Sequence, residues 1–125
     1  MKHITFYLDF ISPFAYLAFE KLPETLLGLN YQVTYKPVLF AAMLSQHGQL
    51  GPAEIPAKRD WTYRHVLWLA HTHQVPLHMP AAHPFNPLAL LRPRPRRPPG
   101  AARVRSRSCR TQWKNSWKSV SKKVT

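Results

Sequence analysis

The chain has 125 residues, 45% of them hydrophobic, and a formal net charge of +13. This length allows one small domain, and thirteen prolines with only four glycines argue against a simple helical bundle. No apolar run is long enough to span a membrane, and a single cysteine, Cys109, excludes an intramolecular disulfide. The first ten residues alternate like a strand and contain Asp9, unlike a signal peptide, so we expect a cytoplasmic protein.

The first predicted elements form a strand–helix–strand unit. Residues 3–10 (HITFYLDF) are rich in β-branched and aromatic side chains, as strands are. Ser12 and Pro13 are typical of a helix N-cap and first helical position, and apolar spacing predicts an amphipathic helix over 13–27. Residues 31–39 (YQVTYKPVL) predict a second strand. If the two strands share a sheet, they are parallel and joined by a right-handed crossover.

The following residues predict mainly helices separated by loops. Asn86 and Pro87 are a second N-cap pair that opens a short helix. On the longest of these helices, Trp61 and His65 lie on the same face as Trp68 and Leu69. The predicted segments are a short helix over 40–46, a loop over 49–56, a longer helix over 57–74, a proline-rich stretch over 75–87 and a short helix over 88–91.

The charge of the chain changes abruptly after Leu91. Residues 1–91 contain six Lys or Arg and all five acidic residues, a net charge of +1. Residues 92–125 contain twelve Lys or Arg and no acidic residue, a net charge of +12. We therefore predict a globular domain over 1–91 and a disordered basic tail over 92–125. The switch to Arg-, Pro- and Ser-rich sequence suggests translation in a shifted reading frame, a hypothesis that the nucleotide sequence beyond codon 91 tests.

Ser12 lies where the first strand meets the first helix. A helix N-terminus carries unpaired N–H groups and positive partial charge, which stabilise an anion such as a thiolate and lower its pKa. Thioredoxin-like proteins usually hold Cys-x-x-Cys here, whereas Ser-Pro-Phe-Ala has no sulfur and cannot exchange disulfides. The Ser12 hydroxyl can still donate a hydrogen bond to a thiol brought by a ligand. The simpler alternative is that Ser12 serves only as an N-cap.

Several separated motifs resemble one enzyme family. FYLDFISPFAYLAFEKLP is similar to the N-terminus of the 2-hydroxychromene-2-carboxylate isomerases, relatives of kappa-class glutathione transferases in the DsbA-like thioredoxin superfamily. The similarity continues through KPVLFAAMLSQHGQLGPAEIPAKRDWTYRHVLWLA and MPAAHPFNPLALLR, and covers about residues 3–92. It implies an α/β thioredoxin-like fold with an N-terminal βαβ unit and the start of a helical insertion. Residues 92–125 do not resemble the C-terminal ββα half that completes the family fold, so we expect a truncated domain with impaired catalysis.

The resemblance also implies a reaction and a set of site residues. The family converts a 2-hydroxychromene-2-carboxylate, an intermediate of aromatic-compound degradation, to a trans-hydroxybenzylidenepyruvate with glutathione as cofactor. The serine corresponding to Ser12 poises the glutathione sulfur, which adds reversibly to the substrate, allows rotation about a carbon–carbon bond and leaves again. Lys58 matches a basic position that can pair with the substrate carboxylate as a compact charge. Asn86 matches a polar position near the substrate, and full-length members can form homodimers.

Each of these assignments has an alternative. Lys58 can simply begin a solvated helix, and Asn86 can serve only as an N-cap. A kappa-like glutathione transferase would share Ser12 and differ in the electrophile that it accepts. We expect the Trp61 and Trp68 pair to be packing residues rather than a stacking site.

Two further patterns, a group of histidines and the basic tail, bear on binding functions. His65, His71 and His73 do not have the i, i+4 spacing with which a helix clasps zinc, and no cysteine or carboxylate joins them, so we predict no metal site. The tail, with Trp113 and Trp117 among its basic residues, can bind nucleic acid non-specifically through phosphate contacts and stacking. A basic nucleic-acid-binding or interaction protein is therefore the non-enzymatic alternative.

Overall fold

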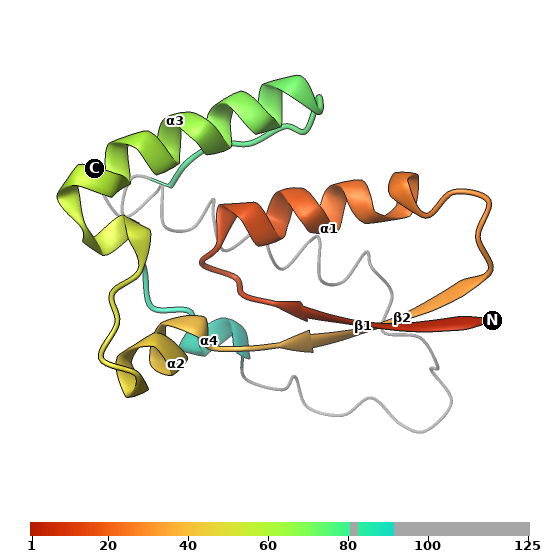
Figure 1. Ribbon diagram of the computed structural model, residues 1–125, viewed down its shortest axis with the longest axis horizontal. Coiled ribbons are helices and arrows are strands. Elements are labelled where there is room, and N and C mark those ends of the chain that lie inside the picture. Colours follow the sequence, from red (N-terminus) through yellow and green to blue (C-terminus); the bar gives the residue numbers. More distant parts are fainter. Residues whose placement is uncertain (81–82, 92–125) are drawn as a thin grey trace. The chain divides into compact units, whose positions relative to one another are not determined.

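The chain divides into two units. The computed structural model describes residues 1–80 and 83–91 (Figure 1). One compact unit is Met1–Leu77, and the second begins at His78. The predicted basic tail, residues 92–125, lies outside the described residues. In chain order the elements are β1 (Lys2–Leu8), α1 (Pro13–Thr25), β2 (Tyr31–Pro37), α2 (Phe40–Gln46), η1 (Pro52–Glu54, a 3-10 turn), α3 (Pro56–Thr72) and α4 (Leu88–Leu91).

The predicted βαβ unit is present. Figure 1 shows α1 lying along a sheet of two strands, β1 and β2, which it connects. The strands pair in parallel, with Lys2 opposite Tyr31 and Leu8 opposite Pro37, so the predicted parallel arrangement is confirmed. β1 ends two residues earlier than predicted because the Ile11 N–H donates to Asp9 Oδ1 and turns the chain.

The hydrophobic core of the first unit lies between the sheet and the helices. The Phe19 ring of α1 makes edge contacts with Phe6 of β1 and Tyr35 of β2, at centroid distances of 6.4 and 5.3 Å. Tyr7, on the opposite face of β1, is exposed, as the alternation of strand side chains requires. The buried apolar side chains are Leu8, Phe10, Tyr16, Leu17, Phe19, Val66, Ala70 and Val75.

The predicted helices are also present, with small differences in their ends. The loop predicted over 49–56 contains η1, because the Gly51 N–H donates to Glu54 Oε2 over 2.7 Å and closes a turn. α3 ends at Thr72, two residues before Gln74, whose φ of 55° is incompatible with a continuing helix. No helix within the described residues is long and apolar enough to cross a membrane.

Candidate functional site

Ser12 is the N-cap of α1, as predicted. Its backbone is extended, with φ −76° and ψ 114°, and its Oγ accepts a hydrogen bond of 3.2 Å from the Ala15 N–H. The Ser12 carbonyl accepts the Tyr16 N–H at 3.2 Å, which starts the helical ladder. A hydroxyl has one hydrogen and two acceptor lone pairs. The capping bond therefore uses a lone pair and leaves the hydroxyl hydrogen available to a ligand.

The first turn of α1 provides a favourable environment for an anion. Two backbone positions of this turn offer no donor to a ligand, because Pro13 has no N–H and the Ala15 N–H is already bonded to Ser12. The favourable contribution comes instead from the helix dipole. No acidic residue occupies this turn, so the positive end of the helix dipole is not neutralised from within the helix. A partly exposed negative charge at such a position gains about 0.3–1 kcal/mol. The turn can therefore stabilise the thiolate form of a ligand's sulfur and lower its pKa.

Asp9 is a residue of this site that sequence reasoning missed. It directly follows β1, is only 7% exposed, and accepts hydrogen bonds from the Ile11 and Phe40 amides. The available signal was an acidic residue inside the apolar run LDFI. Such a residue is rarely buried unless its oxygens are bonded.

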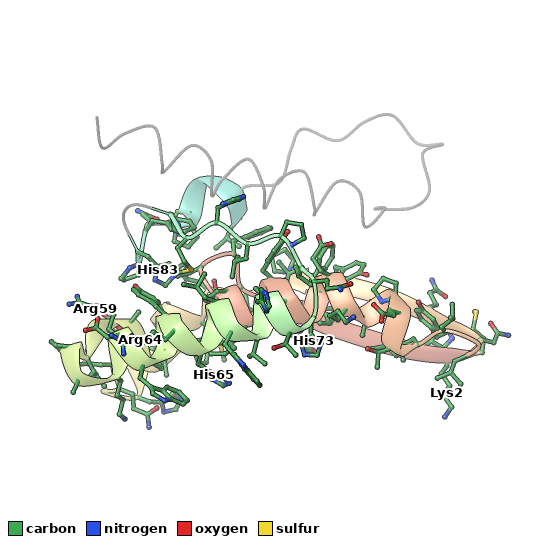
Figure 2. All side chains as sticks on the ribbon, turned by 90° about the horizontal axis from the view of Figure 1, so that it is seen from above. Lys2, Arg59, Arg64, His65, His73 and His83 are labelled. Carbon is green, nitrogen blue, oxygen red and sulfur yellow. The ribbon has the colours of Figure 1, made fainter. Side chains whose placement is uncertain are left out.

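α3 presents a row of four side chains along one face. Lys58, Trp61, His65 and Trp68 follow one another at spacings of three, four and three residues, which keep them on one side of a helix. The His65 ring lies 4.8 Å from the Trp61 ring centroid and 6.1 Å from that of Trp68, nearly parallel to the latter. Figure 2 shows His65 projecting from the side of α3. We name these four residues the α3 row.

The expectation that Trp61 and Trp68 are packing residues is wrong. Their side chains are 64% and 61% exposed, whereas α3 buries Thr62, Val66 and Ala70. Helical periodicity defines both faces, but only the docking of α3 beside α1 decides which face is covered. The covered face lies next to the α3 row, so the indole rings border the core without entering it.

One contact joins the α3 row to the turn at Ser12. The ring of Phe14, the second residue of α1, lies 5.7 Å from the His65 ring in an edge contact. Phe14 is itself 37% exposed. The N-terminus of α1 and the aromatic part of the α3 row therefore form adjoining surfaces of the same unit.

The other two predicted site residues are exposed. Lys58 lies in the first turn of α3 and makes no ion pair within the described residues, whereas its neighbour Arg59 lies 4.0 Å from the Asp60 carboxylate. Asn86 belongs to the second unit, where its Oδ1 accepts the Leu88 N–H at 3.0 Å. This bond confirms the predicted cap of α4, and the ligand roles of Lys58 and Asn86 stay predictions.

Comparison with protein families identifies the fold. Residues 3–92 match the DSBA-like thioredoxin domain. The chain belongs to the DsbA-like thioredoxin family. The βαβ unit with α3 beside α1 is an N-terminal thioredoxin-like half, as expected from the motifs around Ser12.

This DsbA-like chain is also similar to curated enzymes. It is 35% identical over 83 residues to a 2-hydroxychromene-2-carboxylate isomerase of Sphingobium xenophagum, covering 65% of the chain and 43% of that protein. It is 29% identical over 80 residues to an isomerase of the same name from Pseudomonas sp. (strain C18), covering 62% and 38%. It is 28% identical over 74 residues to glutathione S-transferase kappa 1 of Rattus norvegicus, covering 59% and 33%.

These matches are partial in length. The chain spans less than half the length of the curated relatives that it matches. No solved structure matches the chain significantly.

Proposed function

We propose that the chain acts, with impaired turnover, in a glutathione-dependent cis–trans isomerisation of the 2-hydroxychromene-2-carboxylate type. The observation that carries this proposal is the Ser12 hydroxyl at the N-terminus of α1, where it replaces the sulfur of a Cys-x-x-Cys site. The similarity to two proteins named as isomerases of this substrate, at 35% and 29% identity, supports the reaction.

The residues around Ser12 fit the sulfur end of glutathione. Bound glutathione supplies a nucleophilic sulfur that adds to the substrate, allows rotation about a carbon–carbon bond and leaves unchanged. Ser12 accepts the Ala15 N–H with one lone pair and donates its own hydrogen to that sulfur. A hydrogen bond to a charged group contributes about 1.5–3 kcal/mol, so it can lower the thiol pKa by one to two units, in addition to the helix dipole.

The α3 row fits an aromatic carboxylate in the same proposal. Lys58 supplies a cation for the carboxylate, and the exposed Trp61 ring offers a face for an aromatic ring. Exposed indole rings gain most from covering by another ring, because this removes apolar surface from water. The reaction belongs in the cytoplasm, where the glutathione pool is kept reduced.

The test is turnover of 2-hydroxychromene-2-carboxylate by the purified chain, followed by absorbance and by titration of free thiol. An isomerase consumes substrate only when glutathione is present and leaves the thiol concentration constant. A kappa-like transferase, the alternative favoured by the 28% identical transferase, consumes glutathione in proportion to product. Turnover without glutathione contradicts both functions.

A second test addresses Lys58. The variant Lys58→Gln keeps a long polar side chain but removes the cation, so we expect KM for the carboxylate to rise about tenfold, equivalent to about 1.4 kcal/mol, while the affinity for glutathione is unchanged. The control is Lys2→Gln, an exposed lysine at the start of β1, remote from the end that leads to Ser12. Equal KM values for the two variants contradict the role of Lys58.

A further inference from the structure

Asp9 is a buried carboxylate whose two oxygens join two separate segments of the chain. Oδ1 accepts the Ile11 N–H at 2.9 Å, within the turn that leads to Ser12. Oδ2 accepts the Phe40 N–H at 3.2 Å, 31 residues away, at the first residue of α2. The Asp9 carbonyl also accepts the Ser12 N–H at 3.2 Å. Three hydrogen bonds to Asp9 therefore connect the β1–α1 turn, Ser12 and the start of α2.

No other common side chain can make the same bonds. A charged carboxylate is costly to bury, and Asp9 makes no ion pair within the described residues, so its charge is compensated by amide donors. Asparagine has the same shape but only one acceptor oxygen, so its NH₂ group would face one of the two amide donors. The geometry thus depends on both carboxylate oxygens of Asp9.

The bond to Phe40 also replaces a missing helix cap. Leu39 is the N-cap of α2 and has no side-chain oxygen with which to cap it. Asp9 accepts the first amide of α2 instead, from the end of the neighbouring strand. Because of this bond, the turn before Ser12 cannot shift without disturbing the start of α2.

We propose that Asp9 is a positioning residue that orients the Ser12 hydroxyl toward the sulfur of a bound thiol; this inference rests on the proposed function. Asp9 fixes the backbone of residues 9–12, and Ser12 makes the contact with the sulfur. A direct effect of the Asp9 charge on the sulfur would raise the thiol pKa, because a nearby negative charge disfavours a thiolate. Positioning of Ser12 by Asp9 lowers this pKa instead. The direction of the change on removing the charge therefore separates positioning from direct electrostatics.

The experiment is a double-mutant cycle on the full chain, in which Asp9 and Ser12 are replaced singly and together. The quantity measured is the pKa of the thiol of added glutathione, followed by the absorbance of its thiolate. We expect Asp9→Asn to raise this pKa by about one unit, a tenfold loss of thiolate below the pKa. In the Ser12→Ala background the same change has no effect, because the group through which Asp9 acts is absent. The matched control is Asp60→Asn, a carboxylate 80% exposed on α3, which leaves the pKa unchanged in both backgrounds.

A second pair of variants tests the inference without altering Asp9. Phe40→Pro removes the donor to Asp9 Oδ2, and proline is tolerated at the first position of a helix. Phe40→Ala removes the same half-exposed ring but keeps the N–H. We expect a higher thiol pKa in Phe40→Pro than in Phe40→Ala, so the test stands even if Asp9→Asn does not fold.

The possible outcomes are distinct. Positioning through Ser12 is overturned if the thiol pKa falls in Asp9→Asn. It is also overturned if Asp9→Asn raises the thiol pKa equally in the wild-type chain and in the Ser12→Ala background. A pKa that is unchanged in Asp9→Asn while the melting temperature falls shows a purely structural role and also overturns it. If the wild-type chain does not lower the pKa of glutathione at all, the proposed function fails, and the inference fails with it.

Discussion

Substitutions at Ser12 can separate its helix-capping role from its role toward a thiol. Ser12→Ala removes the oxygen that accepts the Ala15 N–H. Replacing an N-cap serine by alanine costs about 0.5–2 kcal/mol. The bond here is 3.2 Å, at the long end of the usual range, so we expect a loss of about 0.5–1 kcal/mol.

Ser12→Asp keeps the capping acceptor and adds a negative charge at the positive end of α1. That charge is worth about 0.3–1 kcal/mol, so the variant should equal or exceed the wild-type chain in stability. An ionised Asp has no hydrogen to donate and repels a thiolate, so glutathione-dependent activity is lost. Ser12→Ala thus loses both the helix cap and the glutathione-dependent activity, whereas Ser12→Asp loses only the activity.

The assay combines urea unfolding, followed by helical circular dichroism, with glutathione-dependent turnover on the same preparations. If the free energy of unfolding falls with urea concentration at the same slope in each variant, differences in the unfolding midpoint report differences in stability. Ser45→Ala, in the exposed surface of α2, is the control; it should leave activity unchanged and should not destabilise the chain, because alanine has a higher helix propensity than serine. Full activity in Ser12→Asp would refute the hydrogen-bond role of Ser12, and unchanged stability in Ser12→Ala would refute the capping argument.

Three other predictions concern the core, a surface pair and the tail. Leu8→Ala, at a fully buried position, should cost about 2–5 kcal/mol in urea unfolding, whereas Leu27→Ala, at 83% exposure, should cost under about 0.5 kcal/mol; similar losses would contradict the assigned core. The hydrogen bond and positive charge of Lys21 hold the pKa of Glu24 below its ordinary value, so the small stabilisation from this exposed pair is present at neutral pH and is lost as the pH falls through that lowered pKa. An NMR titration of the Glu24 carboxyl should move to higher pH in Lys21→Ala, and an unmoved titration would contradict this pairing. The twelve cations of residues 92–125 should make the affinity for single-stranded DNA fall as salt is added. The logarithm of the binding constant, plotted against the logarithm of the salt concentration, should have a slope of up to about −8. An affinity independent of salt would rule out this electrostatic mode.

Local sequence signals were sufficient for the elements that carry Ser12. A serine followed by proline fixes the start of α1, because both residues favour the same helix boundary for independent reasons. The alternating residues of β1 and β2, and the long helical connection between them, then favour parallel pairing across α1. The helix cap and the strand patterns depend on neighbours within a few residues, so the sequence contains that information directly.

The features that could not be predicted depend on contacts between distant segments. The bond from the Phe40 N–H to Asp9 joins residues 31 apart, and neither residue type indicates the other. Likewise, the spacing of Trp61 and Trp68 places them on one face of α3, but it does not specify that the adjacent face, which contains Val66, is the buried one. Tertiary packing decides both, which is why the sequence does not indicate the contacts of Asp9 and why the expectation that Trp61 and Trp68 are packing residues is wrong.

We propose that Ser12, at the N-terminus of α1, activates the thiol of a bound ligand. The most direct measurement is the pKa of the glutathione thiol in the presence of the wild-type chain and of Ser12→Ala, from thiolate absorbance as a function of pH. We expect a thiol pKa below that of free glutathione with the wild-type chain. In Ser12→Ala this pKa should rise toward the free value by about one to two units, the contribution of the Ser12 hydrogen bond. An identical thiol pKa with both proteins would contradict it.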